Sequence, residues 1–153
     1  METKFEVKPI GIVANDRREA IDDNWDSVIS TIIINDDIPF TSLTGIQDFS
    51  HLEIIYIFNK AINTPFEWAT YPRGNKNYPL TGIFAQRKKE RPNYLGLCTV
   101  ELIEVKGNHL KVKYLDAING SPVLDIKPVF KEFEPEIPIK QADWASDLMK
   151  NYW

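Results

Sequence analysis

The sequence contains a single cysteine, only two histidines and no long run of apolar residues. One cysteine, Cys98, excludes an intrachain disulfide and a cysteine-based zinc cluster. His51 and His109 lie far apart in the sequence and lack the spacing of metal ligands, so we expect no metal. No apolar run approaches the roughly 18 residues that cross a bilayer, so we expect no membrane span. The charged start, METKFEVKPIG, differs from a signal peptide, and we expect a cytoplasmic protein.

Several familiar signatures are also missing. No GxGxxG follows a predicted strand, which leaves a Rossmann nucleotide site unsupported, and neither a Walker loop nor a GxSxG elbow occurs. The net charge of −4 disfavours a protein that coats nucleic acid with its whole surface. A local cationic patch is still possible, because residues 86–91, QRKKER, contain four cations and one anion. The alternative for such a run is a solvated turn.

Most of the chain has the character of β-structure. At 153 residues it fits one domain, residues 1–153, that is long enough to bury a core. Segments rich in β-branched and aromatic residues, bounded by turn formers, predict strands at 28–35, 51–58, 80–85, 97–105, 109–115 and 123–130. A hairpin at 106–108 joins two of them, and Pro128 is expected to limit the pairing of the last. Short strands of this number predict a barrel or a sandwich.

Helical signal is concentrated at the C-terminal end. In DWASDLMKNYW, Trp144, Leu148 and Tyr152 recur at helical spacing, and Asp143 is a plausible N-cap. We expect a short helix that covers a barrel face or a subunit partner. Residues 63–79 have little periodicity and predict a long loop over a site or a partner.

Two places could carry ligand chemistry. In LDAINGSPVLDIKP, residues 115–128, a tight turn exposes backbone N–H groups together with short polar side chains. Such a turn could bind hydroxyl or amino groups of a small ligand, or it could be a structural Asx turn. His51, at the start of a predicted strand, either caps its own loop or lines a pocket.

GIFAQRKKERPNYLGL (82–97) and the 115–128 segment together resemble the TsaA/TrmO family of S-adenosylmethionine-dependent methyltransferases. The family signature is close to GxFATRSPxRPNPIGLS, followed by DxxDGTPVLDIKPY. FSHLEIIYIF (49–58) and PIGIVAN (9–15) are similar to two further family segments. The resemblance therefore spans nearly the whole chain.

The resemblance implies a mainly β fold, a single-sheeted β-barrel with a few short helices, and a homodimer. It implies S-adenosylmethionine as cofactor and methylation of N6 of threonylcarbamoyladenosine beside the tRNA anticodon. In that family the RPN-containing loop belongs to the cofactor pocket and the adjoining dimer interface. Matched by position, the implied cofactor residues are Asn59, Lys60, Arg87, Leu97, Asp116, Ala117, Ile118 and Asn119. We also expect Phe84 as an apolar wall of the cofactor site, and Asn24 and Trp25 at the place of a further family cofactor element. Three cations, Lys88, Lys89 and Arg91, are expected to contact RNA phosphates, whereas the sequence identifies no general base.

The chain also departs from the family pattern. DDNWDS, residues 22–27, stands where the family has a Pro-Arg-Gln cofactor element. Lys88-Lys89 replaces Ser-Pro, Tyr94 replaces the second proline of RPNP, and Asn59 replaces a histidine. These differences indicate a divergent branch with a DDNW element. Two alternatives follow: a methyltransferase acting on a small molecule or a protein, and a noncatalytic module that binds S-adenosylmethionine.

Overall fold

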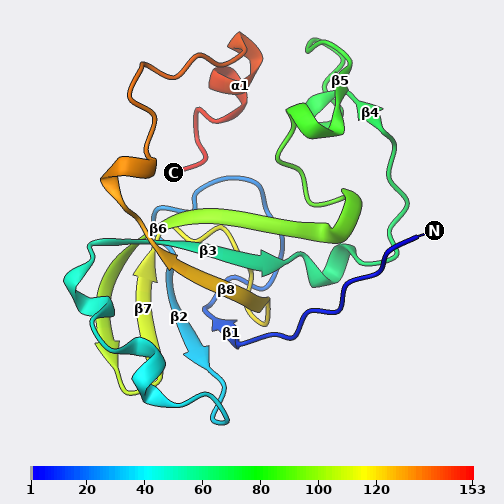
Figure 1. Cartoon of the computed structure of the whole chain (residues 1–153). Coiled ribbons are helices and arrows are strands. Elements are labelled where there is room, and N and C mark those ends of the chain that lie inside the picture. Colours follow the sequence, from blue (N-terminus) through cyan, green and yellow to red (C-terminus); the bar gives the residue numbers. More distant parts are fainter. Residues whose placement is uncertain (1) are drawn as a thin grey trace.

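The structure, a computed structural model, describes residues 2–153 and is mainly β (Figure 1). Its strands are β1 (Gly11–Ala14), β2 (Ile29–Ile34), β3 (His51–Ile57), β4 (Ala69–Thr70), β5 (Thr81–Gly82), β6 (Leu95–Lys106), β7 (His109–Lys113) and β8 (Pro122–Pro128). A short helix, α1, spans Asp143–Leu148. Short 3₁₀ turns occupy Phe40–Leu43, Ile46–Asp48, Asn59–Ala61, Pro72–Gly74, Ile83–Ala85, Pro92–Tyr94 and Lys131–Phe133.

Six of the strands close into one barrel, in the order β1-β2-β7-β6-β3-β8. Every neighbouring pair is antiparallel, and β8 closes the barrel by pairing with both β3 and β1. The predicted hairpin is confirmed, because β6 ends at Lys106 and β7 begins at His109. Pro128 stands at the last paired position of β8, opposite Leu52, as the missing N–H of proline requires.

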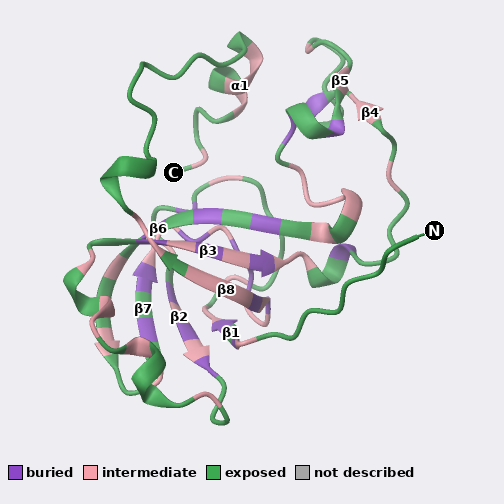
Figure 2. Cartoon of the chain, in the orientation of Figure 1, coloured by how far each residue is buried: buried purple, intermediate pink, exposed green. Residues whose placement is uncertain are grey.

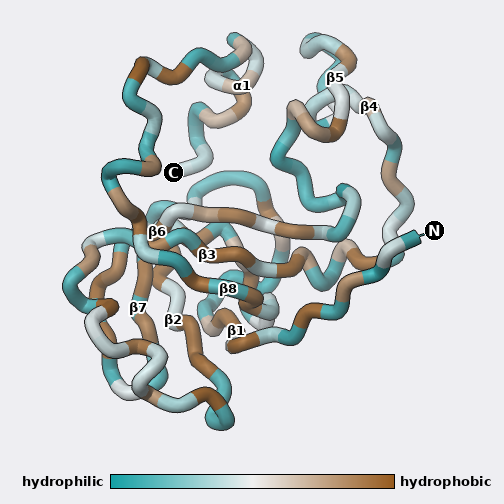
Figure 3. The backbone as a smooth tube through the Cα atoms, viewed as in Figure 1, coloured by the Kyte–Doolittle hydropathy of each residue, from teal (hydrophilic) through white to brown (hydrophobic). Residues whose placement is uncertain are grey.

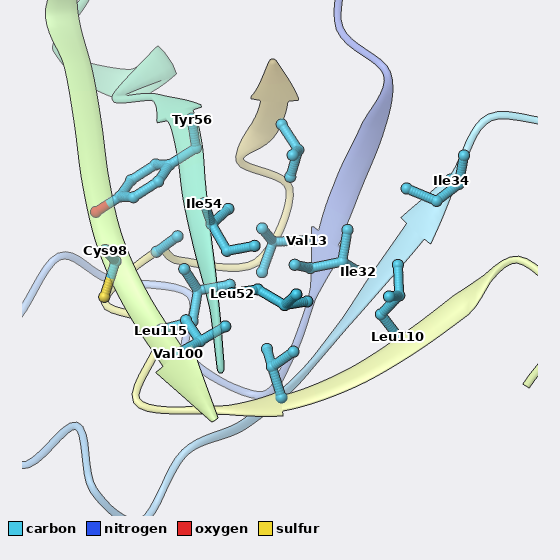
Figure 4. Packing of buried hydrophobic residues seen from close by; sticks show 13 residues of the cluster. Val13, Ile32, Ile34, Leu52, Ile54, Tyr56, Cys98, Val100, Leu110 and Leu115 are labelled. Atoms are coloured by element: carbon cyan, nitrogen blue, oxygen red, sulfur yellow. The ribbon is translucent and has the colours of Figure 1, made fainter. Parts of the chain in front are cut away.

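The core fills the inside of the barrel. Along β3, buried Leu52, Ile54 and Tyr56 alternate with more exposed residues, as the two-residue period of a strand requires. Side chains from β2, β6 and β7 meet them, among them Ile32, Val100 and Leu110 (Figure 4). Apolar residues mark the barrel strands in Figure 3, whereas hydrophilic residues dominate several of the connecting loops. The two-residue period of the strands therefore sets which residues face inward.

The predicted strand at 80–85 is mostly wrong. Only Thr81–Gly82 is extended, pairing with β4, and Ile83–Ala85 forms a 3₁₀ turn. The buried Gln86 amide explains the change of direction, because its Nε2 donates to the Thr81 carbonyl at 2.7 Å and to the Thr70 carbonyl at 3.2 Å. These bonds fold the segment back onto β4 instead of continuing it as a strand.

Two segments rise from the same side of the barrel in Figure 1: the β4–β5 lobe, residues 63–86, and the C-terminal segment that carries α1. Both are mostly exposed or half-buried, whereas buried residues concentrate on the barrel strands (Figure 2). The expected helix forms over Asp143–Leu148, but it ends before Tyr152, which the helical spacing includes. Ala142 rather than Asp143 is its N-cap residue, and no side chain caps it. No helix within residues 2–153 has both the length and the apolar composition needed to cross a membrane.

Candidate functional site

A cavity of about 990 Å³ lies between the barrel, residues 85–90 and the C-terminal segment. This volume is at the upper end of the range for small-molecule sites, about 300–1,000 Å³. Its lining contains cations, carboxylates and aromatic rings together. Within the part of the chain that the structure describes, His, Cys, Asp and Glu side chains form no group of three that could hold a metal ion.

Asp116 forms the acidic wall of the cavity. The Tyr56 hydroxyl donates to Asp116 Oδ1 at 2.7 Å, and the Tyr152 hydroxyl donates to Asp116 Oδ2. Burial, followed by the nearby Asp116 carboxylate, raises the pKa of both tyrosines. Each phenol therefore stays protonated and acts as a neutral O–H donor to the carboxylate.

The position of Tyr56 depends on Gly96. The two residues are directly opposite each other on β3 and β6, and the Tyr56 ring extends from β3 toward β6 (Figure 4). A Cβ atom built on Gly96 would lie 2.4 Å from Tyr56 Cζ and 2.6 Å from Cε2. The ring therefore occupies the space that any side chain at residue 96 would need. This contact explains the glycine in RPNYLGL, since no turn requires it.

Cationic side chains line another part of the cavity. Arg87 Nη2 donates to the Leu97 carbonyl at 2.6 Å, and Lys60 Nζ donates to the Arg18 carbonyl at 2.9 Å. Lys88 and Lys89 both pair with Glu90, with their Nζ atoms 3.8 Å and 3.4 Å from its carboxylate oxygens. The wall keeps an excess of positive charge, although Glu90 offsets part of it.

Arg91 has a different role from its neighbours. Its Nη1 donates to the Gln86 carbonyl at 2.9 Å, so the side chain closes the 86–91 loop from inside. Asn93 and Tyr94 follow with positive φ angles of 63° and 53°, and the Tyr94 hydroxyl accepts a bond from the Asn63 N–H at 3.3 Å. The stretch that follows QRKK is therefore a braced loop that holds the cationic side chains against the barrel.

The DDNW element joins three parts of the chain. Asp23 pairs with Arg73 of the β4–β5 lobe at 3.0 Å, and Trp25 is buried and lines the cavity. Arg17 stabilises the element through two contacts. Its guanidinium carbon lies 4.2 Å from the Trp25 ring centroid, and its Nη2 donates to the Asp23 carbonyl at 2.6 Å. The backbone N–H of Trp25 donates to the Tyr152 carbonyl at 2.8 Å. The element thus connects the lobe, the cavity and the C-terminal segment.

The C-terminal apolar side chains face the cavity of their own chain. Trp144, Leu148, Met149, Tyr152 and Trp153 all line it. This position agrees with the first expectation for the segment, a cover for a barrel face.

Cys98 lines the cavity without the features of a nucleophile. Its Sγ donates to the Tyr114 carbonyl at 2.8 Å, and burial raises the pKa of the thiol. A nucleophilic cysteine needs a lowered pKa and access to substrate. Cys98 is a core residue of the barrel that reaches the cavity surface.

The structure gathers most of the residues expected at a cofactor or RNA site. Those that line the cavity are Trp25, Asn59, Lys60, Arg87, Lys88, Lys89, Asp116, Ala117 and Ile118; His51 lines it too. The others lie outside the lining: Asn24, Phe84, Arg91, Leu97 and Asn119. Phe84 is 79% exposed and packs on Trp68, whereas the Leu97 carbonyl binds Arg87. Asn119 Oδ1 accepts from the Asn15 N–H at 3.1 Å, which ties the 116–121 turn to β1.

Sequence reasoning missed Tyr56, Tyr152 and Arg17. Tyr56 has the period of a core strand residue, and Tyr152 belongs to an aromatic helical stripe. Neither pattern signals a bond to a carboxylate 60 or 36 residues away. A glycine within an apolar strand was the one available sign, because it marks a close approach of another group.

The closed antiparallel barrel, with a cavity of small-molecule size lined by apolar, aromatic and charged side chains, defines the class of fold and site. The family described as "tRNA-methyltransferase O N-terminal domain" matches residues 22–135, and the chain belongs to this family. The predicted family and fold are therefore confirmed.

Relatives carry two kinds of description. An "S-adenosyl-L-methionine-binding protein" of Archaeoglobus fulgidus is 36% identical over 86% of this chain and 91% of its own length. A "tRNA (adenine(37)-N6)-methyltransferase" of Escherichia coli is 33% identical over 68% of this chain, which spans only 46% of that protein. The crystal structure of TrmO from Pseudomonas aeruginosa has a TM-score of 0.73 and 23% identity, covering 92% of this chain and 63% of that one. The chain therefore spans most of the first relative and less than two thirds of the other two proteins.

Proposed function

We propose that this chain is an S-adenosylmethionine-dependent methyltransferase that methylates N6 of a modified adenosine in tRNA. The observation that carries the proposal is the cavity, which collects residues expected at the cofactor or RNA site from four separate segments, around positions 25, 59–60, 87–89 and 116–118. Support for the tRNA substrate comes from the methyltransferase relatives. Support for the cofactor comes also from the binding-protein relatives.

The donor set of the cavity fits S-adenosylmethionine. This cofactor carries a carboxylate, an ammonium group, ribose hydroxyls and an adenine ring. Arg87 and Lys60 could hold the carboxylate, and a guanidinium suits it through a bidentate fork. Asp116 could accept from N–H or hydroxyl groups, and Trp25 supplies an aromatic wall. The proposal needs no metal.

The sulfonium of the bound cofactor supplies an electrophilic methyl group, so alignment is the main task left to the protein. The two phenols hold the Asp116 carboxylate in one orientation. A bound N–H group that donates to this carboxylate is therefore oriented as well. The C-terminal segment covers part of the cavity and limits the access of water to it. Arg87, Lys88 and Lys89 place positive charge beside the cavity, where a phosphate of the acceptor could bind.

Transfer of a labelled methyl group from S-adenosylmethionine to total RNA tests the proposed function directly. Label in RNA supports the proposal. Label only in a small-molecule or protein fraction contradicts it, and so does cofactor binding without any transfer. Running the reaction with a chelator also tests whether transfer is independent of metal.

We further propose that Lys88 and Lys89 bind RNA phosphates at the rim of the cavity. Lys88→Glu combined with Lys89→Glu is expected to weaken RNA binding strongly and leave cofactor affinity nearly unchanged. The loss of two phosphate contacts should flatten the log–log salt dependence by about 1.8 for duplex RNA and ~1.4 for single strands. Filter binding of tRNA at two salt concentrations measures both effects.

The matched control for this variant is Lys106→Glu with Lys111→Glu. Both residues are exposed on the barrel and do not line the cavity, and the net charge changes by the same amount. RNA binding should survive in the control. If the Lys88/Lys89 variant binds tRNA as the parent does, the proposed contact of these two lysines with RNA phosphates is wrong.

We also propose a homodimer that forms through the β4–β5 lobe and a cytoplasmic location. The most exposed large apolar side chains of the lobe are Trp68 at 66%, Leu80 at 61% and Phe84 at 79%. The Trp68 and Phe84 rings lie 6.3 Å apart between centroids, and exposed apolar surface of this kind marks an interaction site. The dimer proposed from the family resemblance would use the RPN-containing loop, which follows the lobe in sequence.

Trp68→Ser with Phe84→Ser is expected to convert the dimer to a monomer, as measured by light scattering, because the shared apolar surface is lost. Phe133→Ser is the control, since Phe133 is 84% exposed but lies outside the lobe. A lobe variant that remains dimeric would overturn the proposed interface. A monomeric parent would overturn the dimer itself.

A further inference from the structure

The C-terminal segment, residues 143–153, places the Tyr152 side chain against Asp116 on the cavity wall. Two backbone bonds attach it to the DDNW element: the Asn24 N–H donates to the Asn151 carbonyl at 3.0 Å, and the Trp25 N–H donates to the Tyr152 carbonyl at 2.8 Å. These bonds fix the backbone on both sides of the Tyr152 side chain. The ring of Tyr152 is thereby directed to Asp116.

Aromatic packing fixes the Tyr152 ring as well. The Trp153 ring lies edge-on to the Tyr152 ring at a centroid distance of 4.9 Å and edge-on to the Tyr114 ring at 5.4 Å. Such edge-to-face pairs are the favoured geometry for aromatic side chains. The hydroxyl of Tyr152 is consequently held at a defined place on the cavity wall.

Asp116 keeps its charge available to a ligand. Its two oxygens accept from Tyr56 and Tyr152, which are neutral donors, and an ionised carboxylate has lone pairs left beyond these two bonds. None of the ion pairs found within residues 2–153 includes Asp116. The carboxylate is therefore oriented by two phenols and neutralised by no cation in direct contact.

We propose that Tyr152 is a positioning residue: together with Tyr56 it orients the Asp116 carboxylate to accept a hydrogen bond from an N–H group bound in the cavity. The inference rests on the proposed function and deepens it, because it names the chemistry that this wall recognises. Two sources supply such a group, the ammonium or amino N–H of the cofactor and the exocyclic N–H of the acceptor adenosine. The C-terminal segment thereby completes the site within its own chain.

Tyr152→Phe tests the inference, because it removes the hydroxyl and keeps the ring. The matched control is Tyr78→Phe, since Tyr78 donates to Asp147 on the same segment but does not line the cavity. Calorimetry with S-adenosylmethionine measures cofactor affinity, and steady-state kinetics with tRNA measures kcat and KM. Thermal unfolding of both variants monitors the fold.

If the N–H group belongs to the cofactor, Tyr152→Phe raises the Kd for S-adenosylmethionine about tenfold, as loss of one charge-assisted bond implies. If it belongs to the acceptor, the Kd stays constant and kcat or KM for tRNA worsens about tenfold. Tyr78→Phe should leave all three constants unchanged. Either of these patterns supports the positioning role and identifies its partner.

Three results would overturn the inference. The first is a Tyr152→Phe variant with unchanged Kd, kcat and KM. The second is tighter cofactor binding by Tyr152→Phe, which would show that the Tyr152 hydroxyl hinders binding of S-adenosylmethionine. The third is an equal loss in Tyr78→Phe, which would assign the effect to anchoring of the segment. Failure of the proposed function is separate, because a parent protein that binds the cofactor without methylating tRNA still allows the Kd comparison.

Discussion

Gly96→Ala is expected to lower the free energy of unfolding by roughly 2–4 kcal/mol, combining overpacking with loss of a hydrogen bond to a charged group. The added Cβ would lie 2.4 Å from Tyr56 Cζ, a distance that the packed ring cannot accept. Tyr56 is only 1% exposed, so its ring has little free space to move into. Displacing the ring also removes the hydroxyl from Asp116, so the Kd for S-adenosylmethionine should rise with the loss of stability. Urea unfolding and calorimetry measure the two effects.

Gly82→Ala is the control for this experiment. A Cβ at Gly82 would meet nothing closer than the Trp68 carbonyl oxygen at 3.8 Å, and its φ of −64° suits any residue. Its stability should change by less than about 1 kcal/mol. In a Tyr56→Ala background the cost of Gly96→Ala should largely disappear, because the colliding ring is gone. Equal costs in both backgrounds would show that the ring contact is not the cause.

Asp116→Asn is expected to lower methyl transfer by about 100-fold or more and to destabilise the fold by roughly 1.5–3 kcal/mol. The amide keeps one acceptor oxygen and presents N–H groups to the other phenol, so that phenol can no longer donate to residue 116 and its charge-assisted bond is lost. The cavity also loses the negative charge of its acidic wall. Labelled-methyl transfer and urea unfolding check the two expectations.

The control for Asp116→Asn is Asp125→Asn on β8. Asp125 pairs with Lys127 at 3.0 Å on the outer surface, and exposed ion pairs of this kind contribute about 0–1 kcal/mol. Transfer should be unaffected in the control. Normal methyl transfer by the Asp116→Asn protein would show that the Asp116 carboxylate is not needed for the reaction.

Much of the barrel could be predicted because its strands bury alternate residues. Segments 97–105 and 109–115 carry that alternation in the sequence, and they became β6 and β7. The strand predicted at 80–85 was wrong for most of its length. Its apolar residues suit a strand, but the hydrogen bonds of the buried Gln86 amide bend the chain there. Side-chain bonds of this kind depend on tertiary contacts that a local pattern does not contain.

The site was predictable only where a motif carried it. Arg87 and Asp116 were found through the family resemblance, and both line the cavity. The tyrosine pair that holds Asp116 joins residues 60 and 36 positions away, so no spacing rule points to it. The role of Asp22 and Asp23 was likewise hidden, since their partner Arg73 is on a lobe whose position the sequence does not define.

The modified nucleosides of tRNA test the central proposal most directly. Mass spectrometry would compare tRNA from a strain that lacks this protein with tRNA from its parent, before and after incubation with the purified chain and S-adenosylmethionine. We expect N6-methylated threonylcarbamoyladenosine in the parent, its absence from the deletion strain, and its return on incubation with the chain but not with the Asp116→Asn variant. Identical nucleoside profiles in the two strains, with no new methylated adenosine after incubation, would contradict the proposal.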